Sequence, residues 1–359
     1  MPSRADLESL DRADPLARFR DLFALPEGVI YLDGNSLGAQ PRQTAARLAE
    51  VVEREWGRDL ITSWNRNGWI DYPARLGGKV ARLIGADADE VLVCDTTSIN
   101  LFKALTAALD QRPDRRVILA DRANFPSDLY IAEGLARRRP DATVRLVEET
   151  ELAGAIDDSV AVVTLTQVNY KTGYLHDMAA LTRAAHEAGA LVVWDLAHSA
   201  GALPIDLNGA GADYAVGCGY KYLNGGPCAP AFLYVARRHQ AKIDPPLPGW
   251  LGHAEPFAFD TDYRPAEGMR RNLCSMPSIL ASAALEVGLD LMLDAGIYAL
   301  RTKSLALTET FIRVVERRCP GLFDLATPRD PARRGSQVSL RHPEGYAIVQ
   351  ALIARGVIG

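Results

Sequence analysis

Residues 191–201 read LVVWDLAHSAG, and this stretch decides the fold class. It begins with an apolar run that ends at Asp195, where polar residues take over. Similar runs rich in Val, Leu and Ile lie at 90–94, 116–120 and 161–166, with helical patterns between them. Strands that are apolar on both faces belong in a sheet covered by helices on both sides. We therefore predict an α/β fold with a mostly parallel sheet and ligand groups at its strand ends.

A different pattern begins near Pro277 and indicates a smaller C-terminal α+β domain. Its expected elements are helices over 279–295, 297–318 and 344–354, with the segment QVSL at 337–340 before the last helix. After the last helix, Val357-Ile358 reads as a strand that is just starting. We therefore expect this domain to be truncated.

The N-terminal part has a strand candidate at 29–32 and a helical pattern over 42–56. We expect this part to pack on both domains. The predicted division is an N-terminal segment (1–60), a large domain that carries the ligand site (61–276) and a small C-terminal domain (277–359).

The composition excludes several classes of protein. The chain has 359 residues, 48% of them hydrophobic, with a formal net charge of -5 and no Lys/Arg cluster, so no nucleic-acid partner is expected. Residues 1–20 lack the apolar region of a signal peptide, and no segment holds about 18 uninterrupted apolar residues. We therefore expect a cytoplasmic protein without membrane association.

The cysteines and histidines point to neither disulfides nor a metal. Five cysteines are too few for a disulfide scaffold in this length, and none forms a C-x-x-C pair, so we expect reduced thiols. The six histidines show no H-E-x-x-H or comparable spacing, so no protein-held metal is expected.

Asp195 and Lys221 are the most informative pair. Asp195 closes one buried strand and Lys221 follows the next. Pyridoxal phosphate needs such a pair, because a carboxylate keeps its pyridine nitrogen protonated and an amine forms an imine with its aldehyde. A lysine in a partly apolar pocket loses its proton readily and can serve as nucleophile and base. Each residue alone fits a plainer interpretation, Asp195 as a helix cap and Lys221 as a surface lysine.

Further residues suit the same cofactor. His198, three positions past Asp195, can lie along the ring, although a lone histidine is more often a core residue. In DTTSINLF (95–102), hydroxyl groups stand between a strand and a helix, where free N–H groups favour a phosphate; simple N-capping is the alternative. Phe125, in NFPSD (124–128), can stack on a planar ring or fill the core. The glycine motifs of nicotinamide enzymes and P-loop nucleotide hydrolases are absent.

Taken together, these motifs resemble those of the kynureninase family, which has the aminotransferase-like fold type I and uses pyridoxal phosphate. The resemblance covers nearly the whole chain. Its matching stretches are YLDGNSLG (31–38), DTTSINL (95–101), NFPSD (124–128), VNYKTG (168–173), WDLAHSAG (194–201), YKYLNGGP (220–227) and GWLGH (249–253).

The resemblance implies roles for individual residues. Lys221 would bind the cofactor covalently, Asp195 would face its ring nitrogen, Phe125 would stack on the ring and Tyr220 would act beside Lys221 in catalysis. Further cofactor contacts would come from Thr97, Ser98, Asp128, Thr166, His198, Tyr220, Trp250 and Met276. Trp64, Asn35 and Ser36 would shape the substrate pocket.

The implied reaction is the hydrolysis of L-kynurenine, and by the same chemistry 3-hydroxykynurenine, to anthranilate or 3-hydroxyanthranilate and L-alanine in tryptophan catabolism. The implied assembly is a homodimer with its sites between subunits. Two departures from the family stand out. Ser275-Met276 replaces a Gly-Thr whose threonine helps to hold the phosphate of the neighbouring subunit, so only main-chain N–H groups could do so here. The family's later strands, with an arginine for the substrate carboxylate, have no counterpart.

Two alternatives stay open at this point. A cysteine desulfurase shares the fold and cofactor, but its lysine typically follows a histidine, whereas Tyr220 precedes Lys221 here. That enzyme also needs a nucleophilic cysteine, and Cys319 lies at a predicted helix end. The second alternative is a catalytically inactive homologue that binds cofactor or forms dimers.

Overall fold

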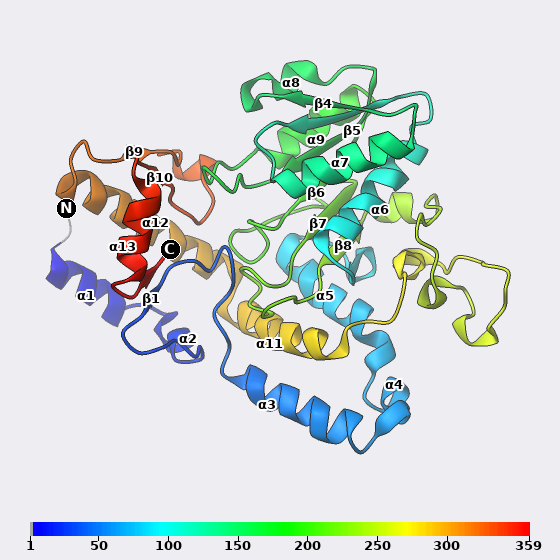
Figure 1. Ribbon diagram of the computed structural model, residues 1–359, viewed down its shortest axis with the longest axis horizontal. Coiled ribbons are helices and arrows are strands. Elements are labelled where there is room, and N and C mark those ends of the chain that lie inside the picture. The colour runs from blue at the N-terminus through cyan, green and yellow to red at the C-terminus, as the bar shows by residue number, and fades with distance from the viewer. Residues whose placement is uncertain (1–2) are drawn as a thin grey trace.

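The computed structural model describes residues 3–359 and is built around a seven-stranded sheet (Figure 1). The strand order is β2-β8-β7-β6-β5-β3-β4, and β8 alone runs antiparallel to its neighbours. The strands are β2 (Val91–Val93), β3 (Val117–Asp121), β4 (Thr143–Val147), β5 (Val160–Thr166), β6 (Leu191–Asp195), β7 (Tyr214–Gly217) and β8 (Phe232–Val235). This sheet confirms the predicted α/β class and its mostly parallel strands.

Helices cover both faces of the sheet because its strands are apolar on both faces. Along β6, Val192 and Trp194 join one buried core, whereas Leu191 and Val193 join another. The first core includes side chains of α5 and α9, and the second includes those of α6 and α7. The helices of this part are α5 (Tyr72–Ile84), α6 (Thr97–Asp110), α7 (Pro126–Arg138), α8 (Leu152–Ala155), α9 (Met178–Glu187) and α10 (Arg237–Gln240).

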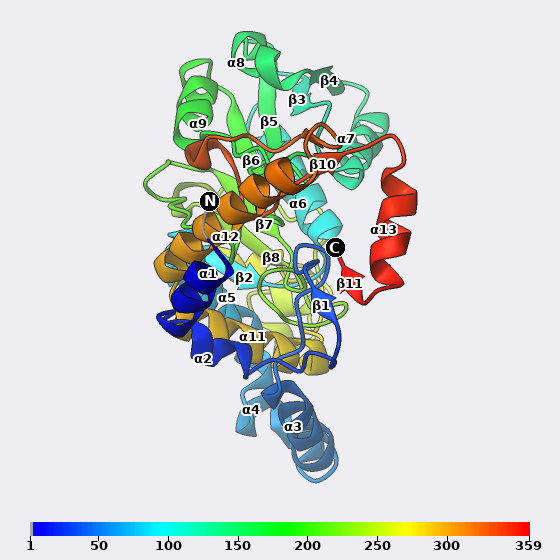
Figure 2. The same cartoon turned by 90° about the vertical axis from the view of Figure 1, so that its left-hand side faces the viewer.

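The N-terminal part forms a projecting arm (Figure 2). Its elements are α1 (Arg4–Arg12), α2 (Ala17–Arg20), β1 (Ile30–Tyr31), α3 (Gln43–Glu50), the π-helical turn η1 (Val51–Trp56) and α4 (Ser63–Arg66). The helix expected over 42–56 is therefore α-helical only as far as Glu50. Within this part, the arm is the stretch from α3 through η1 and η2 (Leu60–Thr62) to α4, and it points away from the sheet.

The C-terminal part lies beside the N-terminal one. It contains α11 (Ile279–Ala295), α12 (Ile297–Arg318), β9 (Asp324–Leu325), β10 (Leu340–Arg341), α13 (Gly345–Ile353) and β11 (Val357–Ile358). The expected helices are present, and the segment 337–340 contributes only its last residue to a strand. β9 pairs with β10, and β11 pairs in parallel with β1, so Ile30 lies opposite Val357.

Short 3₁₀ helices connect the larger elements. They are η2 (Leu60–Thr62), η3 (Trp69–Asp71), η4 (Ala88–Glu90), η5 (Glu149–Glu151), η6 (Trp250–Gly252), η7 (Pro256–Ala258), η8 (Gly268–Asn272) and η9 (Pro331–Arg333). Among the described residues, no helix is both long enough and apolar enough to cross a membrane.

Candidate active site

Loops that follow β3, β5, β6 and β7 converge on Lys221. Because these strands are parallel, their carboxyl ends share one edge of the sheet. Lys221 is buried there, and its Nζ lies 2.9 Å from Nε2 of His198. His198 follows β6, so the structure brings two of the predicted residues into direct contact.

His198 is held in its neutral form. Burial and the nearby charge of Lys221 lower the pKa of His198 to about 4, against an opposing contribution from the side chain of Gln337. Nδ1 of His198 and Oε1 of Gln337 are both buried without a hydrogen bond to any residue of 3–359. If Nδ1 carries the imidazole proton, Nε2 is free to accept a hydrogen bond from Lys221.

Asp195 and Asp128 form a second buried group beside the lysine. Oδ1 of Asp195 accepts a hydrogen bond from the Ala197 N–H at 2.8 Å, and its Oδ2 accepts one from the Thr166 hydroxyl at 3.4 Å. Burial raises the pKa of Asp195, and burial together with the charge of Asp195 raises the pKa of Asp128. Two such carboxyl groups favour a cationic group placed beside them.

Two aromatic rings flank the lysine amine. The ring centres of Phe125 and Tyr220 lie 5.7 and 5.8 Å from Nζ of Lys221. Phe125 also packs edge-on against Tyr170, at 5.0 Å between ring centres. Phe125 is partly exposed and its ring lies near the Lys221 amine, which suits a stacking role.

The predicted phosphate turn lies at the start of α6. The Thr96 side chain accepts a hydrogen bond from the Ile99 N–H at 3.4 Å and caps the helix. Thr97 and Ser98 are the first two residues of α6 and are partly exposed, so their N–H groups stay available for an anion.

These residues fit pyridoxal phosphate. A buried amine contacts a neutral histidine, and Oδ2 of Asp128 and Nδ1 of His198 are buried without a partner among the described residues. Buried polar atoms of this kind normally have a hydrogen-bond partner, so their lack of one suits a polar ligand. The helix N-terminus for the phosphate is that of α6, which follows the edge strand β2 of the same sheet.

The turn with Asn35 and Ser36 lies against the lysine loop. The Ser36 hydroxyl donates to Oδ1 of Asp33 at 2.7 Å, and the Gly38 N–H donates to the Tyr220 carbonyl at 2.8 Å. A Cβ atom at Gly38 would lie 2.4 Å from the Lys221 carbonyl oxygen, so only glycine allows this approach.

Three predicted residues lie apart from this group and make no hydrogen bond or ring contact with Lys221 within the described chain. Trp64 packs edge-on against Trp69, at 6.1 Å between ring centres. Trp250 contacts Phe257 and Phe259 and donates its indole N–H to the Pro256 carbonyl. Met276 is exposed.

The sequence reasoning missed two residues. Gln337 lies beside His198, and its own amide donates to the Tyr170 carbonyl at 2.7 Å. Lys103 is buried beside the predicted phosphate turn at 95–98, with its Nζ 2.5 Å from Oδ2 of Asp95. A lysine on an otherwise apolar face of a helix was the available signal for Lys103, whereas nothing local marks Gln337.

Known proteins resemble this chain over its full length. Kynureninases of Burkholderia mallei (strain SAVP1) and Pseudomonas fluorescens are 54% and 56% identical over 366 aligned residues, which cover 100% of this chain and 88% of each relative. The family model described as the kynureninase C-terminal domain matches residues 300–359. Among solved structures, a lysine-to-alanine mutant of C-DES, with glycine covalently linked to its PLP cofactor, superposes with a TM-score of 0.80 at 18% identity. That match covers 100% of this chain and 91% of the other.

The shared fold and the group around Lys221 define a pyridoxal-phosphate-dependent enzyme of fold type I. Within that class, identity above one half along the entire chain is decisive. The chain belongs to the kynureninase family.

Proposed function

We propose that this chain hydrolyses L-kynurenine, and by the same chemistry 3-hydroxykynurenine, to anthranilate or 3-hydroxyanthranilate and L-alanine. The identity of 54–56% with kynureninases along the entire chain carries the proposal. The buried Lys221–His198 contact supports it, because it gives the reaction an amine whose proton can be held and returned.

The proposed division of labour follows from the positions of the residues. When bound, pyridoxal phosphate supplies an electron sink for negative charge that develops at the substrate Cα. Lys221 would hold it covalently, with Asp195 beside its ring nitrogen, Phe125 along its ring and the N–H groups of Thr97 and Ser98 around its phosphate.

Other residues would complete the cofactor site. Asp128, Thr166 and Tyr220 lie in the Lys221 group, Trp250 would add a further cofactor contact, and the main chain of Met276 would contact the phosphate of the neighbouring subunit. Trp64, Asn35 and Ser36 would shape the space for the substrate.

Lys221 and His198 would together move the proton of the substrate Cα. Nζ of Lys221 would take the proton from the substrate Cα, and neutral His198 would orient Nζ by accepting a hydrogen bond at Nε2. Only 9% of the Lys221 surface is exposed, which limits the contact of Nζ with bulk water.

The test is to incubate the purified chain with pyridoxal phosphate and L-kynurenine and to follow anthranilate by its fluorescence and alanine by chromatography. We expect equal amounts of both products, and neither from Lys221→Ala. Sulfide from cysteine without anthranilate would favour a desulfurase instead. Cofactor binding without either product would indicate an inactive homologue.

We also propose a homodimer in the cytoplasm. Exposed apolar side chains gather on the arm, among them Val52, Trp56, Leu60 and Ile61, and such a patch suits a protein partner. All five cysteines are unpaired, which suits a reducing compartment. The molar mass from light scattering would test the dimer. A monomer that remains fully active would contradict it.

A further inference from the structure

Lys103 is a buried cation for which the proposed reaction has no use. It lies in the second turn of α6, and only 3% of its surface is exposed. Its Nζ contacts Oδ2 of Asp95 at 2.5 Å and donates to the Asn272 carbonyl at 2.7 Å. A buried ammonium needs such partners because water no longer solvates it.

The Asp95 contact holds a strained residue. Asp95 has a φ of +50°, in the left-handed region that residues other than glycine seldom adopt. Its carbonyl accepts a hydrogen bond from the Ala231 N–H at 3.0 Å. The next residues are Thr96, which caps α6, and then Thr97 and Ser98. The direction of the two proposed phosphate donors therefore depends on the conformation of Asp95.

The Asn272 contact holds the opposite side of the turn. Asn272 ends η8, and the chain continues through Cys274 to Met276. The Cys274 sulfur lies 3.9 Å from Oδ2 of Asp95, so this segment runs directly beside the turn. A Cβ atom at Gly249 would lie 1.6 Å from the Cys274 carbonyl, so the loop that carries Trp250 is tied to the same segment.

We propose that Lys103 is a positioning residue for the phosphate site, which fixes the Asp95–Ser98 turn and the segment 272–276 against each other. The inference rests on the proposed cofactor. Lys103 itself reaches the phosphate only through Asp95 and the main chain of the turn.

The test compares two ligands that differ only in the phosphate. Dissociation constants of pyridoxal phosphate and pyridoxal are measured by absorbance on the apo form of the full chain and of Lys103→Met. Displacing one of the proposed N–H donors of the turn would remove about one charge-assisted hydrogen bond to the phosphate, which corresponds to about tenfold in affinity. We expect at least about tenfold weaker binding of pyridoxal phosphate and nearly unchanged binding of pyridoxal.

Lys79→Met is the matched control. Lys79 also contacts two groups, Glu286 at 2.9 Å and Asp290 at 2.6 Å, but it joins α5 to α11 away from the turn. We expect it to leave the ratio of the two constants unchanged. Equal weakening of both ligands by Lys103→Met would overturn the inference, because it would mark Lys103 as merely structural.

A second variant covers the case in which Lys103→Met fails to fold. Asp95→Asn keeps an acceptor for Lys103, and asparagine tolerates a left-handed backbone, so the fold should be retained while the ion pair is lost. We expect a smaller but phosphate-selective loss, and no selective loss would again overturn the inference. Failure of the unaltered chain to bind pyridoxal phosphate would instead contradict the proposed function.

Discussion

At the scale of single residues, the buried carboxyl groups of Asp195 and Asp128 are proposed to serve the cofactor but lower the stability of the chain without it. Both carboxyl groups are buried, and both have raised pKa values in the folded chain. An acid whose pKa rises on folding stabilises the fold only at low pH, and this contribution is lost as pH rises from its unfolded pKa through its folded pKa. At neutral pH the pair therefore destabilises the apo form.

Asp195→Asn should raise the stability of the apo form. It should also abolish most of the activity of the enzyme with bound cofactor. We expect the free energy of unfolding at pH 7 to increase by about 1–2 kcal/mol, with the gain shrinking as pH falls toward 4. Turnover should fall at least about 100-fold, because no carboxylate then faces the ring nitrogen. Urea unfolding at several pH values and an anthranilate assay measure the two effects.

Asp206→Asn is the control for this prediction. Asp206 is exposed, and its Oδ1 accepts a hydrogen bond from the Gly209 N–H at 2.8 Å. Its replacement should leave turnover unchanged and bring no gain in stability. A loss of stability in Asp195→Asn at pH 7 would show that the carboxylate is stabilised in the folded apo form.

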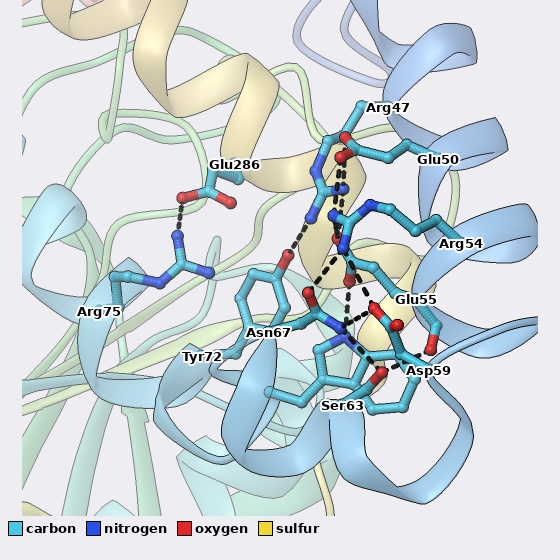
Figure 3. A network of polar contacts seen from close by, with 11 residues as sticks. Arg47, Glu50, Arg54, Glu55, Asp59, Ser63, Asn67, Tyr72, Arg75 and Glu286 are labelled. Carbon is cyan, nitrogen blue, oxygen red and sulfur yellow. Dashed lines mark hydrogen bonds and ion pairs between the residues drawn. The ribbon is translucent and has the colours of Figure 1, made fainter.

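At the scale of elements, the arm depends on one buried carboxylate (Figure 3). Only 3% of the Glu55 side chain is exposed, and it accepts hydrogen bonds from Arg47 and from the indole of Trp69, each at 2.7 Å. Its carbonyl accepts a hydrogen bond from the Ser63 hydroxyl at 2.5 Å. Glu55 thereby joins η1 to α4, which carries Trp64.

Glu55→Ala should lower the free energy of unfolding by about 3 kcal/mol, because it leaves buried donors without an acceptor. Glu50 is the matched control, since it contacts Arg47 at 3.0 Å but is 48% exposed. Glu50→Ala should cost less than about 1 kcal/mol. Urea titration of both variants measures the difference, and equal losses would contradict the role assigned to Glu55.

Two adjacent glycines of α5 make a second test at this scale. A Cβ atom at Gly77 would lie 2.1 Å from the Val91 carbonyl of β2, whereas one at Gly78 would meet nothing closer than the Ala88 methyl at 3.6 Å. Gly77→Ala should destabilise the fold by at least about 2 kcal/mol through this clash. Gly78→Ala should stabilise it by roughly 0.5–1 kcal/mol, because alanine favours a helix. Thermal unfolding separates them, and a tolerated Gly77→Ala would mean that α5 can shift on β2.

How well the sequence predicted an element depended on how local its cause was. The runs at 161–166 and 191–195 became β5 and β6 nearly residue for residue, since burial on both faces fixes their composition. The π-helical turn η1 was missed because the helical pattern does not show the contacts that Glu55 makes outside the helix, such as that with Trp69. Lys103 carried a local signal, but its role was missed because its partner Asn272 lies 169 positions away.

At the scale of the whole molecule, the exposed apolar side chains of the arm bear on assembly. Trp56 is 59% exposed and Ile61 is 75% exposed. If the arm packs on a second copy, Trp56→Glu with Ile61→Glu should convert the proposed dimer to monomer, because buried unpaired charges are costly. Tyr346→Glu, on α13 away from the arm in both views, is the control and should leave the mass unchanged. Light scattering measures the mass, and a dimer that survives the double change would place the interface elsewhere.

The pairing of β1 with β11 bears on the order in which the chain folds during synthesis. Ile30 and Tyr31 pair with a strand at 357–358, so this strand must leave the ribosome before β1 finds its partner. In the same way, β2 cannot pair until β8 has been synthesised. Contacts between such distant segments form slowly, and unpaired strands invite aggregation meanwhile. On a nascent chain, β1 should therefore stay unpaired until residue 358 has left the ribosome.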